Sequence, residues 1–139
     1  MKTENTKTMR EAWLHRADIV NKIIEAIATR GRNFFAHQDK IAIISVDEKG
    51  QLWYNCEYIS QSDHTGKFCL SVTNPLSDFK WYHGGTLKAL VLDFVDFIYT
   101  GEYSNGNHGY GGLFCPHWGY SEKDMQEIQT IAKELNYLQ

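Results

Sequence analysis

The segment from Leu87 to Tyr99 constrains the fold more than any other part of the chain. Its side chains are mostly apolar and leave only a narrow polar stripe, formed by Asp93, Asp96 and Thr100. A helix that is apolar over most of its circumference is buried on nearly all sides. We therefore expect a central helix here, with the rest of the chain around it and Gly101 just after its end.

Two features of this helix also suggest chemistry. Asp93 and Asp96 lie one helical turn apart, and paired carboxylates can bind a metal ion or transfer protons. The preceding "HGGT" (83–86) offers backbone amides that could bind an anion at a helix start. The favoured interpretations are structural. The aspartates mark the side that meets solvent or caps a neighbouring loop, and the glycines form a tight turn that lets the helix approach the sheet.

An amphipathic helix is expected near the N-terminus. Thr8 and Glu11 have the spacing of a capping box, and Gly31 follows as a stop signal. Residues 1–7 then form a flexible polar lead-in, and a chain of 139 residues fits a single domain, placed at 8–139. The buried side chains of this helix recur at helical spacing: Trp13, Ala17, Val20, Ile23, Ile24 and Ile27.

The middle of the chain has the pattern of β-strands. The turn "DEKG" (47–50) separates two runs rich in β-branched and aromatic residues. Short connections between consecutive strands favour an antiparallel meander. The expected strands are "NFFAHQ" (33–38), "KIAIISV" (40–46), "QLWYNCEYI" (51–59), "KFCLSVT" (67–73) and a shorter fifth strand, "FKWY" (79–82).

A last helix is expected after Ser121, which has the position of an N-cap with Asp124 three residues later. Tyr120 and Met125 have the spacing of a hydrophobic staple. The fold class is therefore α+β: an N-terminal helix, a four- to five-stranded antiparallel sheet, then two helices that cover one sheet face.

Several stretches together resemble a family of short, uncharacterised proteins carried by phages and plasmids. The likeness covers roughly residues 33–138 and consists of a Phe-Phe strand, a Gly-x-Leu-Trp strand, and the helix starts Gly-Gly-Thr-Leu and Trp-Gly-Tyr. It implies a mobile-element origin, and small proteins of that origin often inhibit host machinery, anti-CRISPR and other anti-defence proteins included. The matching positions are Phe34, Phe35, Gly50, Leu52, Trp53, Gly84, Gly85, Thr86, Leu87, Trp118, Gly119 and Tyr120.

Charge and composition narrow the classes of partner. The net charge is −3 and no basic run is present, so a direct nucleic-acid ligand is not expected. No apolar run is long enough to span a bilayer, and the polar start lacks a signal sequence. Three cysteines make an odd number, which argues against a secreted disulfide scaffold and favours the cytoplasm.

The segment 102–120 is the strongest candidate for function. It combines glycines with Tyr103, Tyr110, Phe114, Trp118 and Tyr120, and long loops of this kind in compact domains are usually functional. Aromatic anchors beside glycines are typical of protein-recognition surfaces. In the competing interpretation, the aromatic residues from 114 onward fold back over the core. The favoured function is a non-enzymatic domain that binds a host protein and needs no cofactor. The expected contact residues are Tyr103, Asn105, Asn107, His108 and Tyr110.

The alternative is a metal-dependent or thiol enzyme centred on residues 105–120. His108, Cys115 and His117 could bind zinc, but a structural site needs about four ligands and the sequence has no second paired motif. Further ligands would have to come from elsewhere in the fold. Cys56 and Cys69 could sit opposite each other if their strands pair around the connector between them, although free cysteines are usually small buried apolar residues of a sheet. His83 is a further candidate base for a Cys115 nucleophile.

Overall fold

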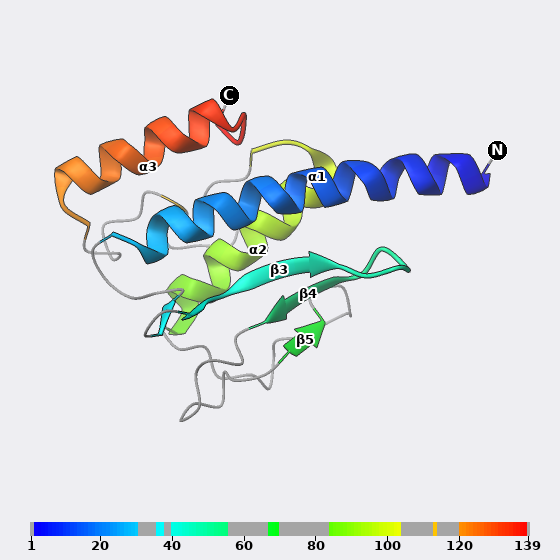
Figure 1. Ribbon diagram of the computed structural model, residues 1–139, viewed down its shortest axis with the longest axis horizontal. Coiled ribbons are helices and arrows are strands. Elements are labelled where there is room, and N and C mark those ends of the chain that lie inside the picture. Colours follow the sequence, from blue (N-terminus) through cyan, green and yellow to red (C-terminus); the bar gives the residue numbers. More distant parts are fainter. Residues whose placement is uncertain are drawn as a thin grey trace.

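The computed structural model describes residues 2–30, 36–37, 40–55, 67–69, 84–103, 113 and 120–138. In chain order these residues form one long helix, five short strands and two further helices. Figure 1 shows α1 lying between α3 and the strand β3, with α2 crossing close to α1. This arrangement puts α2 in the interior, as its apolar sequence predicts.

The first helix, α1, spans Lys2–Ala28. It begins before Thr8, so the N-cap expected there is wrong and most of the expected lead-in is helical. The reason is local: no glycine or proline interrupts this stretch, and the polar residues in it cost less than about 0.7 kcal/mol each in a helix. The predicted buried stripe is confirmed, since Ala17, Val20, Ile23, Ile24 and Ile27 are buried and Trp13 packs against the core.

The strands form two separate sheets. β1 (Ala36–His37) pairs with β2 (Lys40–Ile41), and β3 (Ile43–Val46), β4 (Leu52–Asn55) and β5 (Lys67–Cys69) form an antiparallel sheet in that order. The α+β class and the antiparallel pairing hold, but the expected single sheet of four or five strands is wrong. The expected strand over 40–46 changes partner at Ala42, pairing with β1 before it and with β4 after it. The expected strand at 79–82 lies outside the described residues.

The turn between β3 and β4 is built around Asp47. Its Oδ1 accepts hydrogen bonds from the backbone N–H groups of Lys49 and Gln51, both at 2.8 Å, and its Oδ2 accepts one from Trp53 Nε1 at 3.0 Å. The bond from Trp53 is the largest of the causes that hold the pKa of Asp47 below its usual value. Gly50 has φ +83°, and a Cβ there would lie 2.7 Å from the Trp13 ring. Only glycine therefore fits this turn without strain.

The outer edge of β3 is covered by a polar side chain of α1. Asn21 Nδ2 donates to the carbonyl oxygen of Ile44 at 2.8 Å, and the Ile44 N–H donates to Asn21 Oδ1, also at 2.8 Å. In an antiparallel pair, alternate residues direct both backbone groups away from the partner strand. The Asn21 amide thus takes the place of a neighbouring strand, and Arg10 Nε adds a bond to the Asp47 carbonyl at 2.9 Å.

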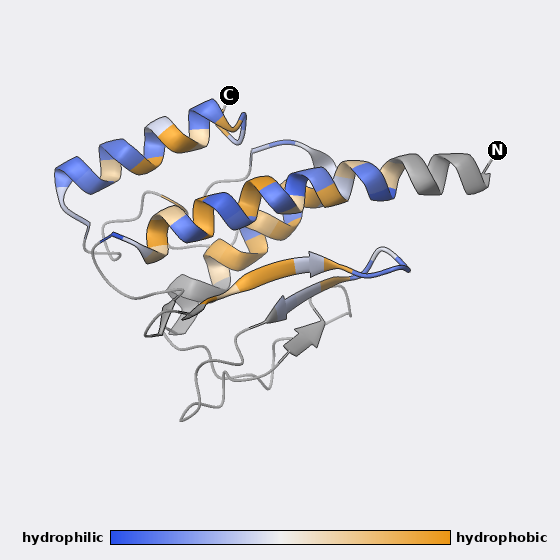
Figure 2. Ribbon diagram, viewed as in Figure 1, coloured by the Kyte–Doolittle hydropathy of each residue, from blue (hydrophilic) through white to orange (hydrophobic). Residues whose placement is uncertain are grey.

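The central helix, α2, spans Gly84–Thr100 and confirms the sequence prediction. Figure 2 shows it apolar along most of its described length. Gly101 follows it with φ +78°, and its N–H donates to the Phe97 carbonyl at 2.8 Å. Arg16 Nη1 on α1 donates to the Ile98 carbonyl at 2.9 Å. The positive charge of Arg16 therefore stabilises the C-terminal end of α2, where the helix dipole is negative. Its fully buried residues include Leu90, Val91, Phe94 and Ile98.

The last helix, α3, spans Glu122–Glu134. The predicted cap is confirmed, because Ser121 Oγ accepts a hydrogen bond from the Asp124 N–H at 3.1 Å. At the other end Asn136 adopts φ +64°, and the N–H of Tyr137 donates to the Ala132 carbonyl at 2.9 Å. This is a Schellman motif, which reverses the chain. The reversal buries Tyr137 completely in the core.

Candidate functional site

The recognition segment, defined here as residues 103–120, is attached to the core at three described positions. Tyr103 packs against the core at its start, Leu113 is 1% exposed in its middle, and Tyr120 packs against the core at its end. Of the five expected contact residues, Tyr103 alone belongs to the described residues. Asn105, Asn107, His108 and Tyr110 lie outside them.

Tyr103 belongs to a cluster of residues that we call the Tyr137 corner. Its members are Asp93, Phe94, Phe97, Tyr103 and Tyr137. The Tyr137 ring centroid lies 4.7 Å from that of Phe97, 5.7 Å from that of Phe94 and 5.1 Å from that of Tyr103. The Tyr103 and Tyr137 rings meet edge-on at 80°. Tyr103 is therefore only partly available for contact with a partner, because its side chain is partly buried against the core.

Asp93 corrects the sequence interpretation of α2. Its side chain is 0% exposed, so the expectation that it marks a side facing solvent is wrong. Burial is the main cause that raises the pKa of Tyr103 to about 12, and the negative charge of Asp93 adds to it. Burial is also the largest cause that raises the pKa of Tyr137, followed by the charges of Asp93, Tyr103 and Asp96. Both phenols are therefore held in their neutral form beside a buried carboxyl group.

Tyr137 is the residue of this corner that the sequence analysis missed. A signal for it is present in "KELNYL" (133–138), where an asparagine follows the last helical residues and an aromatic residue comes next. Asparagine tolerates the left-handed conformation better than most residues, and the residue after it in a Schellman motif often makes an apolar contact. This pattern predicts a chain reversal that directs Tyr137 back to the core.

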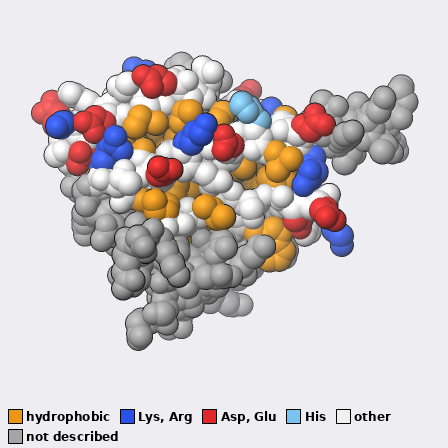
Figure 3. Space-filling model, viewed as in Figure 1, with side chains coloured by type: hydrophobic (Ala, Val, Ile, Leu, Met, Phe, Trp, Pro, Cys, Tyr) orange, Lys and Arg blue, Asp and Glu red, His pale blue; other side chains and the backbone are white. Residues whose placement is uncertain are grey.

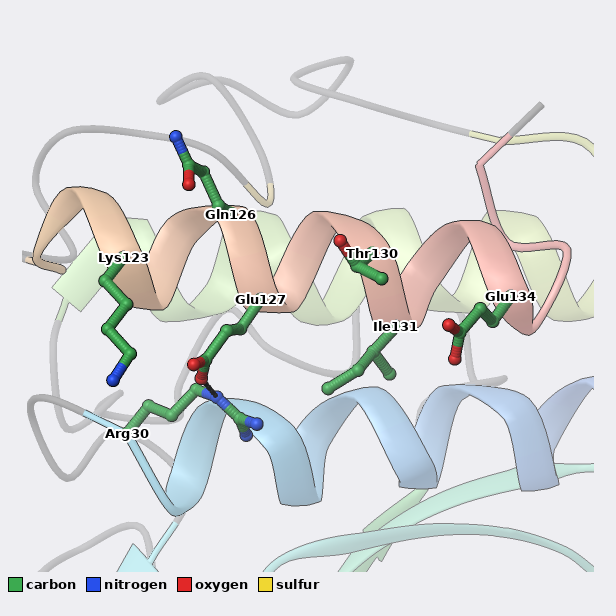
Figure 4. Close-up of a pocket in the computed structure, with 7 residues that line it drawn as sticks. All are labelled: Arg30, Lys123, Gln126, Glu127, Thr130, Ile131 and Glu134. Atoms are coloured by element: carbon green, nitrogen blue, oxygen red, sulfur yellow. Dashed lines mark hydrogen bonds and ion pairs between the residues drawn. The ribbon is translucent and has the colours of Figure 1, made fainter.

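A second candidate site is the groove between the end of α1 and the side of α3 that faces it (Figure 4). It consists of two adjoining hollows of about 510 Å³ and 360 Å³, which share Arg30 and Ile131. Figure 4 shows the larger of the two. Arg30 Nε donates to Glu127 Oε2 at 2.8 Å, and its Nη1 donates to the Ala26 carbonyl at 2.9 Å. The ion pair thus ties the two helices together across the groove.

The charges of this groove balance. Acidic and basic side chains alternate over this side of the molecule (Figure 3), and Arg30 is already paired with Glu127. Lys22, at the rim, also has a partner in Asp18, at 3.3 Å. The groove therefore favours neither a strongly acidic nor a strongly basic ligand. Its lining includes the cations Lys22, Arg30 and Lys123 and the anions Glu25, Glu127 and Glu134.

The metal and thiol alternative has little overlap with the described part of the chain. His83, His108, Cys115 and His117 lie outside it, and so does Cys56. The sheet register places Trp53 opposite Cys69, so the expected pairing of Cys56 with Cys69 across two strands is wrong. Within the ranges given above, no three histidine, cysteine, aspartate or glutamate side chains form a group that could hold a metal ion.

Similarity to known proteins rests on a family match. None of the helices in the described ranges is long and apolar enough to cross a membrane. Neither a curated protein nor a solved structure matches the chain. The YoqU family model matches residues 10–139, a range that includes α2, α3 and the whole recognition segment. The chain belongs to the YoqU family.

Proposed function

We propose that this chain is a small non-enzymatic protein-binding domain from a phage or another mobile element. It acts in the cytoplasm by inhibiting or modulating a host protein, in the manner of anti-defence proteins such as anti-CRISPR inhibitors. The recognition segment provides the contacts, through Asn105, Asn107, His108 and Tyr110, with Tyr103 at its base.

The attachment of this segment at Tyr103, Leu113 and Tyr120 is the observation that supports the proposal most. A loop that packs against the core at its start, middle and end loses less conformational entropy on binding than a loop fixed only at its ends. Tyrosine and histidine side chains on such a loop would then contribute most of the binding energy. The α1–α3 groove is the weaker candidate because its balanced charges select no partner.

The test compares two double variants. We expect His108→Ala with Tyr110→Ala to keep the melting temperature of the wild type while losing capture of the host protein from a host lysate. The matched control is Glu48→Ala with Lys49→Ala, which changes two exposed residues of the β3–β4 turn and should retain capture. Undiminished capture by the first variant, or a large fall in its melting temperature, would contradict the proposal.

The rival interpretation makes a different prediction about metal. A zinc site at His108, Cys115 and His117 would give stoichiometric zinc in purified protein and a loss of folded structure with a chelator. The proposed function instead expects the melting temperature to be the same before and after chelation. Metal analysis of the wild-type protein therefore separates the two interpretations without knowledge of the partner.

A further inference from the structure

We propose that two copies of this chain associate through the α1–α3 groove, with their α3 helices antiparallel across a two-fold axis. In this contact Lys123 of each copy pairs with Glu134 of the other. The groove selects no partner by its net charge, but the order of its charges along α3 is complementary to itself. The proposal goes beyond the proposed function, because it assigns a second surface and involves no host protein.

The two ends of the groove carry opposite charges without partners. Lys123 and Glu134 line the larger hollow and are both exposed. Within the described ranges, neither forms an ion pair or a hydrogen bond with another side chain. Figure 4 shows them at opposite ends of α3. They are about three helical turns apart, or about 16 Å, so they lie on one side of α3 and cannot pair with each other.

Both charges also stand at the end of α3 where the helix dipole disfavours them. Lys123 lies in the first turn and Glu134 is the last helical residue, whereas the dipole favours anions at the start of a helix and cations at its end. The end of α1 lies beside Lys123 and offsets part of this cost, but α1 continues past Glu134 (Figure 4). An antiparallel second α3 would compensate for both, because its negative end would lie beside Lys123 and its positive end beside Glu134.

A two-fold axis at the middle of α3 makes every contact occur twice. Lys123 of one copy then lies opposite Glu134 of the other, and Glu127 lies opposite Thr130. Glu127 already accepts a hydrogen bond from Arg30 through Oε2, and its second oxygen can accept one from the Thr130 hydroxyl of the other copy. Such a short and polar interface predicts a weak dimer that is sensitive to salt.

Sedimentation equilibrium of the purified protein measures the association. For the wild type we expect a reversible dimer at up to about 1 mM protein in about 50 mM salt, which weakens as added salt screens the exposed pairs. Lys123→Glu makes both contacts repulsive and should weaken the dimer by about tenfold or more. The matched control is Lys49→Glu on the β3–β4 turn, because it makes the same change of charge at an exposed residue outside the groove.

The decisive test exchanges the two charges. Glu134→Lys alone should also weaken the dimer, whereas Lys123→Glu combined with Glu134→Lys joins opposite charges again and should restore association to within about threefold of the wild type. A mixture of the two single variants should likewise form a mixed dimer, since each copy then supplies the charge that the other lacks. Both substitutions suit the helix dipole, so α3 is expected to stay folded in every variant.

Three results would overturn the proposal: a wild type that stays monomeric throughout, an equal loss of association in Lys49→Glu, or a double variant as weak as the single ones. Loss of host-protein capture by Lys123→Glu with unchanged self-association would assign the groove to another protein and would overturn it as well. Because self-association is measured on the purified chain alone, its outcome is independent of the capture test at His108 and Tyr110.

Discussion

The edge of β3 and the Tyr137 corner are stabilised in opposite ways. At the β3 edge, polar groups meet fixed partners one to one, as in the two bonds of 2.8 Å between Asn21 and Ile44. At the Tyr137 corner, aromatic rings pack against one another, with ring centroids 4.7 Å to 5.7 Å apart. The first arrangement fixes direction and register. The second contributes most through the apolar area that it removes from water.

The comparison predicts the largest loss of stability at the Tyr137 corner. Tyr137→Ala removes a fully buried aromatic ring that touches Phe94, Phe97 and Tyr103, so we expect the free energy of unfolding to fall by about 3–5 kcal/mol. Denaturant unfolding of the purified protein measures this change. Tyr137→Phe is the control and should cost far less because it keeps the ring. Similar losses in both variants would mean that the hydroxyl, rather than the packed area, stabilises the corner.

Alkaline pH should weaken the same corner without a mutation. A tyrosine whose pKa is raised in the folded protein stabilises it fully below the ordinary value of about 10, and this contribution is lost as the pH rises through the folded value. For Tyr103 that window runs from about 10 to about 12, and burial raises the pKa of Tyr120 and Tyr137 in the same direction. Unfolding midpoints measured across this range should therefore decline, and less steeply in Tyr103→Phe. A midpoint that does not change with pH would contradict the burial of these phenols.

The β3 edge should respond less strongly. Asn21→Ala leaves both backbone groups of Ile44 without their side-chain partner, at a cost of about 1–3 kcal/mol in the free energy of unfolding. Its neighbour Lys22, which forms only an exposed ion pair with Asp18, is the matched control. Lys22→Ala should cost less than about 1 kcal/mol. If the two variants lose equal stability, the Asn21 amide does not serve as a substitute strand.

The contrast also explains which parts of the fold the sequence could predict. The α2 helix, the Asp47 turn and the Ser121 cap depend on neighbours in sequence, and each was expected correctly. The split at Ala42 could not be predicted, because the residues on either side of it have the same β-branched character and only the partner strand changes. The burial of Asp93 could not be predicted either, because it depends on packing against parts of the chain that are far away in sequence. Of the candidate contact residues, the structure describes only Tyr103, and its contact with Tyr137 is likewise long-range.

The cap at Ser121 gives the smallest predicted effect. It tests whether a side-chain hydrogen bond to the backbone stabilises the fold less when it is exposed than when it is partly buried. Like Asn21, Ser121 satisfies a backbone N–H with a side-chain acceptor, but it is exposed and water can replace it. Ser121→Ala should therefore lower the free energy of unfolding by about 1 kcal/mol, whereas Ser121→Asp keeps an acceptor and should stay near the wild type. Denaturant unfolding of both variants measures the difference. A loss at Ser121 larger than that at Asn21 would show that cap formation in α3, rather than coverage of the β3 edge, is the more important polar contribution.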